Sequence, residues 1–128
     1  MKTYLKITRT VWICFCIMFF ITIISCKEGN GGKSNVSGYV KHHDKKIPNA
    51  VVYIKYGATD FPGTNTANYD VSVTADASAH YEFKDLRKGD YYLYSVGYDN
   101  SGPYTVTGGV GVKLKYNKTT ITDIPVTE

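Results

Sequence analysis

The amino-acid sequence predicts an all-β protein, a seven-stranded antiparallel β-sandwich that follows a helical signal peptide. No segment after residue 26 has the periodicity of an amphipathic helix. Short runs rich in Val, Ile and Tyr recur there instead, and clusters of Gly, Pro, Asn and Asp separate them. Eleven of the twelve tyrosines lie in this part, and tyrosine favours strands and binding surfaces. Short strands joined by turns are typical of a sandwich, which we expect over residues 36–128.

The N-terminal residues have the layout of a secretory signal. Basic residues give it a positive start, and the run VWICFCIMFFITII at 11–24 is almost wholly apolar. Ile23-Ile24-Ser25-Cys26 resembles a bacterial lipobox, in which a lipid is attached to the cysteine and the chain is cut before it. The alternative is an uncleaved transmembrane helix, but a membrane span needs about 20 apolar residues. Residues 1–25 are therefore predicted to be a lipoprotein signal peptide, and Cys26 the lipidation site.

A lipid on Cys26 would attach the protein to a membrane. Each buried CH₂ group contributes about 0.8 kcal/mol, and two or more chains anchor a protein stably. Lys27 and Glu28 resemble part of the export signal of Bacteroides-group surface lipoproteins, in which a lysine precedes acidic residues. The sequence thus predicts a lipid-anchored protein of the outer membrane or cell surface. Residues 26–35 are rich in Gly and Ser and are predicted to be a flexible tether.

The first two strands are predicted at 36–42 and 50–56. Pro48 and Asn49 mark the turn between them, and the second strand is rich in Val, Ile and Tyr. The stretch 57–70 (GATDFPGTNTANYD) follows, with many breakers and little periodicity. Loops of this length are often functional or mobile.

Two further strands, 71–75 and 80–84, enclose a tight turn. In the second of them Tyr81 and Phe83 alternate with polar residues, so both rings are predicted to point inward. Leu86 follows in the next turn and is expected to pack into the core.

The last three strands are predicted at 90–98, in a run that ends in 109–116, and at 119–126. The first is apolar or aromatic on both faces, which is typical of a central strand or of a binding surface. The second alternates Val, Leu and Tyr with Gly and Lys and is predicted to be half-buried. In the third the alternation slips between Ile121 and Ile124, which predicts a bulge.

Strands that reverse direction each time gather alternate turns at opposite ends of a sandwich. One end is predicted to hold the turns at 43–48, 76–79 and 99–103. The other is predicted to hold the N-terminus with 57–70, 85–89 and 117–118. The long loop would then face the membrane or a neighbour, and the end that contains Asp76 and Asn100 would point away from it.

Composition and charge exclude several classes of function. Without residues 1–25, twelve basic residues face eleven acidic ones, so no nucleic-acid partner is predicted. Cys14 and Cys16 leave with the signal and Cys26 carries the lipid, so no disulfide is predicted in the mature chain. Ser, Cys and His form no pattern that activates a nucleophile, so we predict no catalytic residue and no cofactor, and do not expect an enzyme.

His42-His43-Asp44 is a cluster of metal-binding residue types. Adjacent residues in a strand point to opposite faces and do not easily reach one ion, so a solvated strand end is predicted, with no metal site. His80 is expected at the surface. The aspartates beside the turns lack the spacing of a calcium loop, and Asx turns explain most of them.

Residues 36–40 (VSGYV) and 46–54 (KIPNAVVYI) resemble the opening of carboxypeptidase regulatory-like domains, which read G-x-V, a short turn and P-x-x-A-x-V. TADASAHYEF at 74–83 and then Leu86, Gly89, Tyr91, Leu93 and Gly97-Tyr98 resemble the rest of the pattern, over about residues 36–98. The resemblance implies a transthyretin-like (prealbumin-type) sandwich of seven strands, in the wider class of Ig-like sandwiches. It implies no catalytic residues, because the domain is an accessory in that family.

The sequence departs from the family at Ala79, where the family usually has Gly. If the turn needs a positive φ there, Ala costs about 1 kcal/mol relative to Gly.

Tyr92 and Tyr94 are the candidate ligand-binding residues. They share one face of the strand at 90–98, opposite Tyr91 and Leu93, and form an outer aromatic stripe if those two residues lie in the core. An outer aromatic stripe would stack on sugar rings or on a partner protein. Ordinary cross-strand packing, or cover from a neighbouring strand, is the structural alternative and the favoured one.

Three classes of function remain. The first is a non-enzymatic surface lipoprotein that binds a glycan or an envelope protein. The second is a structural component of an envelope or appendage complex. The third is a transthyretin-like hydrolase, but 5-hydroxyisourate hydrolases end in Tyr-Arg-Gly-Ser and this sequence ends in Ile-Pro-Val-Thr-Glu. We therefore expect a binding or accessory module.

Overall fold

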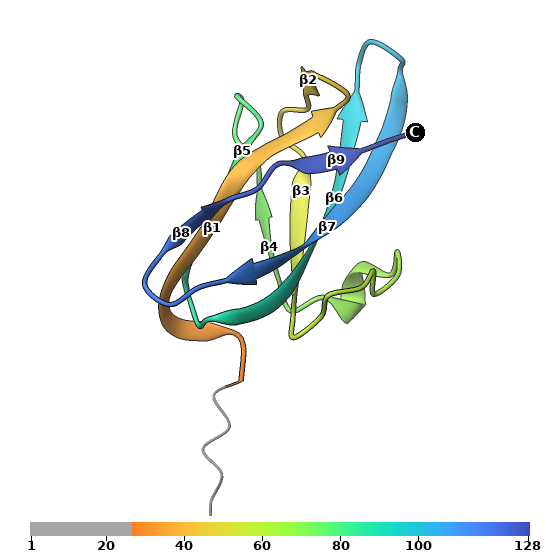
Figure 1. The fold of residues 1–128 in the computed structure, drawn as a ribbon. Helices are drawn as coiled ribbons and strands as arrows, with labels where there is room; N and C mark the ends of the chain where they lie inside the picture. Colours follow the sequence, from red (N-terminus) through yellow and green to blue (C-terminus); the bar gives the residue numbers. More distant parts are fainter. Residues whose placement is uncertain (1–26) are drawn as a thin grey trace, which may run out of the picture.

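The computed structural model describes residues 27–128, and these form two β-sheets that face each other (Figure 1). One sheet contains β1 (Asn30–His42), β2 (Lys45–Lys46), β5 (His80–Leu86), β8 (Thr119–Ile121) and β9 (Ile124–Val126). The other contains β3 (Val51–Tyr56), β4 (Val71–Thr74), β6 (Gly89–Asp99) and β7 (Tyr104–Leu114). A short 3₁₀ helix, η1 (Thr66–Asn68), lies in the loop between β3 and β4. No helix among residues 27–128 is long and apolar enough to cross a membrane.

The all-β prediction is confirmed, and the predicted number of strands is wrong. The described residues form nine strands rather than seven. The difference arises because the predicted turn at 45–49 contains β2, and because the predicted last strand is divided into β8 and β9.

The core lies between the two sheets. Tyr91 and Leu93 of β6 are fully buried, as are Val52 and Ile54 of the neighbouring β3. Tyr81 and Phe83 are buried as their alternation predicts, and Leu86 is buried as expected from its place in the following segment. Removing apolar surface from water contributes about 25 cal/mol per Å², so these side chains drive the two sheets together. The remaining large core residues are Val36, Val40, Ile47, Val106, Leu114, Ile124 and Val126.

The prediction that every strand pair is antiparallel is wrong for the last two strands. Both β8 and β9 run parallel to β1, in the same register. Between them Thr122 and Asp123 leave the ladder, and the Thr122 carbonyl oxygen accepts a hydrogen bond from the Tyr81 hydroxyl at 2.5 Å. The bulge predicted between Ile121 and Ile124 is absent, because β8 and β9 keep the same register with β1 and no extra residue lies between them. Ile121 is 72% exposed and Ile124 is fully buried, as regular alternation requires of residues three positions apart.

The segment predicted as a flexible tether is folded from residue 29 onward. β1 begins at Asn30 rather than at residue 36, and Arg87 donates its backbone N–H to the Gly29 carbonyl at 2.7 Å. A Cβ on Gly32 would lie 2.0 Å from the Leu86 carbonyl oxygen. The glycines thus let this segment pack directly onto the backbone of the turn after β5, where a side chain would not fit.

The turn before β5 has the strain that the sequence suggested. Ala79 has φ 68° and is fully buried. Asp76 stabilises the same turn, because its carboxylate accepts hydrogen bonds from the Ser78 N–H, the Ser78 hydroxyl and the His80 N–H. These hydrogen bonds lower the pKa of Asp76, the Ser78 hydroxyl contributing most.

The turns separate into two ends as the alternation of strand direction predicts (Figure 1). The first described residue lies at one end with the loop 57–70 and the turns at 85–89 and 115–118; we name this the anchor end. The turns at 43–44, 76–79 and 99–103 lie at the opposite end, which we name the far end.

Candidate functional site

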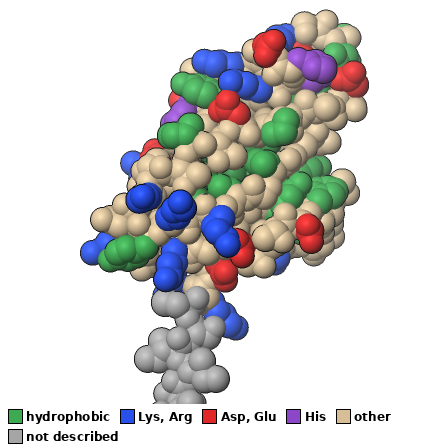
Figure 2. Space-filling view, viewed as in Figure 1, with side chains coloured by type: hydrophobic (Ala, Val, Ile, Leu, Met, Phe, Trp, Pro, Cys, Tyr) green, Lys and Arg blue, Asp and Glu red, His purple; other side chains and the backbone are tan. Residues whose placement is uncertain are grey.

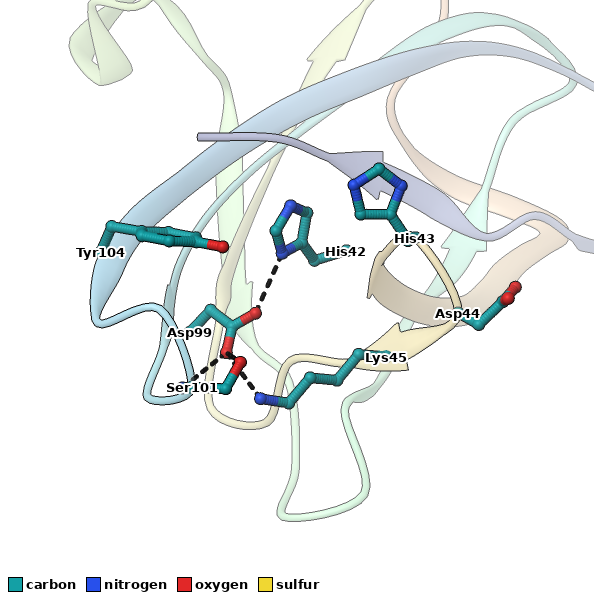
Figure 3. Close-up of a pocket in the computed structure, with 7 residues that line it drawn as sticks. All are labelled: His42, His43, Asp44, Lys45, Asp99, Ser101 and Tyr104. Atoms are coloured by element: carbon teal, nitrogen blue, oxygen red, sulfur yellow. Dashed lines mark hydrogen bonds and ion pairs between the residues drawn. The ribbon is translucent and has the colours of Figure 1, made fainter.

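An open pocket lies at the far end, where β1 meets the turn after β6 (Figure 3). His42 is the last residue of β1, and Asp99 is the last residue of β6. The residues that line the pocket are His42, His43, Asp44, Lys45, Asp99, Ser101 and Tyr104.

His42 is buried and paired, so the prediction of a solvated strand end is wrong for this residue. Its side chain is 7% exposed, and its Nδ1 lies 2.9 Å from a carboxylate oxygen of Asp99, which is itself 2% exposed (Figure 3). Lys45 Nζ lies 2.6 Å from the other carboxylate oxygen. The error arises because adjacent strand residues take opposite faces, so a two-residue motif does not show which one points inward.

The electrostatics of this pair are strongly coupled. The hydrogen bond to Asp99 raises the pKa of the His42 imidazole, and burial partly opposes that effect. Hydrogen bonds from His42, Lys45 and Ser101 lower the pKa of the Asp99 carboxyl. The pair is therefore an imidazolium–carboxylate ion pair at mildly acidic pH.

The His42 ring is not available as a catalytic base in this pocket. The second ring nitrogen of His42, Nε2, lies 2.7 Å from a carboxylate oxygen of Glu128, although the direction does not meet hydrogen-bond geometry. Each nitrogen of the ring thus faces a carboxylate, and neither is left for a substrate. Residues 27–128 also contain no group of three side chains that could hold a metal ion. The contacts of His42 with Asp99 and Glu128 therefore link β1, β6 and the segment after β9.

The His42–Asp99 pair makes the stability of the protein depend on pH. Because the pKa of His42 is raised above 6.5, its contribution is present below pH 6.5 and is lost as pH rises through the folded-state value. Because the pKa of Asp99 is lowered below 3.8, its contribution is present above pH 3.8 and is lost on acidification. We expect the midpoint of denaturant unfolding to fall as the pH rises above 6.5, and the His42→Gln variant to lose most of that fall. The exposed neighbour provides the control, since His43→Gln should keep the wild-type profile. A wild-type slope that survives in His42→Gln would contradict this assignment.

A second candidate site covers the outer face of the other sheet. Five aromatic rings from β3, β6 and the loop 57–70 pack together there, and we name them the aromatic face: Tyr53, Phe61, Tyr69, Tyr92 and Tyr94. Tyr91 and Leu93 point into the core, so the condition for an outer stripe is met and Tyr92 and Tyr94 point outward.

The two predicted binding tyrosines differ in accessibility. Tyr94 is only 3% exposed, because the Tyr69 ring stacks on it at 5.5 Å and the Phe61 ring lies 5.5 Å away. Tyr92 is half-buried, and Phe61 lies 5.9 Å from it. Phe61 itself is 51% exposed. The surface open to a ligand is therefore made by Phe61 and Tyr92, and Tyr94 supports them from below.

The loop 57–70 supplies this cover and is held firmly against the sheet. Asp70 donates its backbone N–H to the Ile54 carbonyl at 2.9 Å and accepts the Tyr56 N–H at 2.7 Å through its carboxylate. The Tyr69 hydroxyl donates to the Gly63 carbonyl, and burial raises the pKa of that hydroxyl to about 12. The aromatic rings are thus presented by ordered backbone rather than by a mobile loop.

Sequence reasoning found half of this site. The sequence predicts Tyr92 and Tyr94 on the outer face and favours cross-strand packing or cover from a neighbouring strand. Tyr94 does pack across the strands against Tyr53, with ring centroids 6.3 Å apart, but the cover comes from the loop. The aromatic residues of that loop, Phe61 and Tyr69, were the available signal. Apolar rings in a long loop need a surface to pack against, and the nearest aromatic strand face provides one.

The predicted lipidation site, Cys26, lies outside the residues that the structure describes. The chain matches no model of a known protein family and no curated protein. The resemblance to carboxypeptidase regulatory-like domains therefore stays a prediction.

Proposed function

We propose that this protein is a lipoprotein of the outer membrane or cell surface, anchored through Cys26, whose β-sandwich binds a partner without catalysis. The exposed aromatic pair Phe61–Tyr92 carries the proposal, because paired rings on a rigid sheet are a stacking surface for sugar rings. We assign a glycan chain of the envelope or of its surroundings as the ligand.

The fold and the pocket chemistry support a binding module rather than an enzyme. His42 has a carboxylate at each ring nitrogen, so this histidine is not available as the base of a transthyretin-like hydrolase. A carboxypeptidase regulatory-like identity agrees with two facing sheets, and it would make the module an accessory unit beside a partner. A structural component of an envelope or appendage complex is the second candidate, since the same aromatic pair also suits a protein partner.

Lipidation of Cys26 is tested first. Cells that express the full chain and are fed labelled palmitate should yield a labelled protein whose mass corresponds to residues 26–128 plus lipid. Cys26→Ser should remove the label, because the thioether needs the sulfur atom. An unlabelled wild-type chain of full length would instead establish the uncleaved transmembrane alternative.

Binding is tested on a glycan array with the membrane-extracted protein. Phe61→Ala and Tyr92→Ala should each weaken binding of the best glycan by about tenfold, since one aromatic contact contributes on the order of 1 kcal/mol. Tyr98→Ala is the matched control, because Tyr98 is as exposed as Phe61 and lies on the same face of β6 as Tyr92, away from the aromatic face. Wild-type protein that binds no glycan, but captures an envelope protein in a manner that needs Phe61, would favour the structural role.

A further inference from the structure

Basic side chains gather around the point where the described chain begins. In Figure 2, Lys and Arg side chains gather at the end of the domain where the described chain begins. Backbone hydrogen bonds bring the segments that carry them together, since Asn35 donates to the Lys118 carbonyl and Arg87 donates to the Gly29 carbonyl. The exposed basic residues of this end, which we name the basic collar, are Lys27, Lys33, Arg87, Lys88, Lys115 and Lys118.

The collar is not neutralised by the domain itself. None of its members forms an ion pair with another residue of the described part of the chain. Of the carboxylates at the same end, Asp70 pairs with Lys55 and Asp90 with Lys113. Glu28, Asp60 and Asp85 remain against the six basic residues of the collar, so a positive balance remains. By contrast, the far end pairs Lys41 with Asp123 and Lys45 with Asp99.

The collar lies close to the proposed lipid. Gly29 is fixed by the Arg87 N–H and donates its own N–H to the Tyr91 hydroxyl at 2.8 Å. Only Lys27 and Glu28 separate it from Cys26, and three extended residues span about 10 Å at most. An acylated Cys26 would therefore hold the collar at the level of the lipid headgroups.

The collar also carries an aromatic side chain suited to that depth. Tyr116 is 62% exposed and lies in the turn between Lys115 and Lys118. Tyrosine and tryptophan are favoured at the boundary between lipid headgroups and acyl chains.

We propose that the basic collar is a membrane-facing surface that binds anionic lipid headgroups and holds the sandwich upright on the bilayer. The proposal rests on the lipid anchor of the proposed function. Each basic residue near an anionic surface strengthens association by roughly fivefold at physiological salt. The far end would then point away from the membrane, with the sheets running outward from it.

A tryptophan reporter tests the proposal on the lipidated protein. Trp12 is the sole tryptophan of the sequence and lies in the predicted signal peptide, so Tyr116→Trp gives the processed chain a single reporter. The variant is extracted from membranes and reconstituted into vesicles of brominated phosphatidylcholine, with or without phosphatidylglycerol. We expect the fluorescence of the introduced tryptophan to be quenched at least about twofold more in the anionic vesicles. The excess quenching should disappear in about 1 M salt, where the Debye length is about 3 Å.

Two charge-matched variants provide the control. Lys115→Gln with Lys118→Gln should remove the excess quenching, whereas Lys41→Gln with Lys46→Gln, at the far end, should retain it. Equal quenching in both kinds of vesicle would overturn the collar while leaving the anchor intact. Protein that leaves the vesicles on flotation in about 1 M salt would show that the lipid anchor is absent, which is a failure of the proposed function and not of the collar alone.

Discussion

Replacing Gly38 with alanine should prevent the chain from folding stably. A Cβ at this position would lie 1.9 Å from the Thr122 carbonyl oxygen, which belongs to the interruption between β8 and β9. The atom that it meets is backbone, and the Tyr81 hydroxyl holds that carbonyl in the core. The Gly38 backbone and the Thr122 carbonyl cannot move apart without breaking the ladder along β1. We therefore expect the free energy of unfolding to fall by about 3 kcal/mol or more. Chemical denaturation followed by circular dichroism measures it.

Gly63→Ala is the control for Gly38→Ala. Gly63 has φ 106°, and a Cβ there would meet no atom within 4 Å. The Gly63→Ala variant should lose only the free energy of an unfavourable backbone conformation, on the order of 1–3 kcal/mol. Equal losses in the two variants would mean that steric contact with Thr122 is not what excludes a side chain at position 38.

Truncating Tyr91 to alanine should be the most damaging change in β6. The ring is fully buried and packs edge-on against Tyr56 at 5.7 Å, and loss of a large buried aromatic side chain costs about 3–5 kcal/mol. The hydroxyl adds a separate contribution, because it accepts the Gly29 N–H and donates to the Arg87 carbonyl at 2.6 Å. Tyr91→Phe isolates that contribution, and an unpaired buried donor costs about 1–3 kcal/mol.

The two Tyr91 variants are distinguished by amide hydrogen exchange. In Tyr91→Phe the amide of Gly29 should exchange much faster, while amides in the middle of β6 keep their protection. In Tyr91→Ala protection should fall throughout the sandwich. Slow exchange at Gly29 in the Tyr91→Phe variant would show that the Arg87 contact alone fixes the start of β1.

The inward faces of the strands could be predicted from sequence because burial imposes a period of two. Tyr81, Phe83, Tyr91 and Leu93 point inward for that reason. The parallel pairing of β8 and β9 with β1 could not be predicted in this way, since alternation reports which face is buried and not which strand lies alongside. The prediction of a flexible tether is wrong for the Gly-rich segment 29–32, because glycine occurs both in flexible coil and in close backbone contacts. Only the partner backbone at Leu86 distinguishes the two cases.

The candidate sites were predictable to different degrees. Tyr92 and Tyr94 follow directly from the pattern of β6, and their outward direction is confirmed. The pairing of His42 with Asp99 joins residues 57 positions apart, and no local pattern links them. The basic collar likewise draws its charges from three separate segments, so it exists only once the turns are brought to one end.

The parallel ladder along β1 also has a kinetic consequence. Asn35 pairs with Thr119, 84 residues later. The sheet that contains β1 is therefore complete only when the last strands of the chain have paired with it. Contacts this distant in sequence slow folding, because a large loop must close before they form. If the chain crosses a translocon N-terminus first, as the proposed anchor requires, it could complete this sheet only after nearly all of it had emerged.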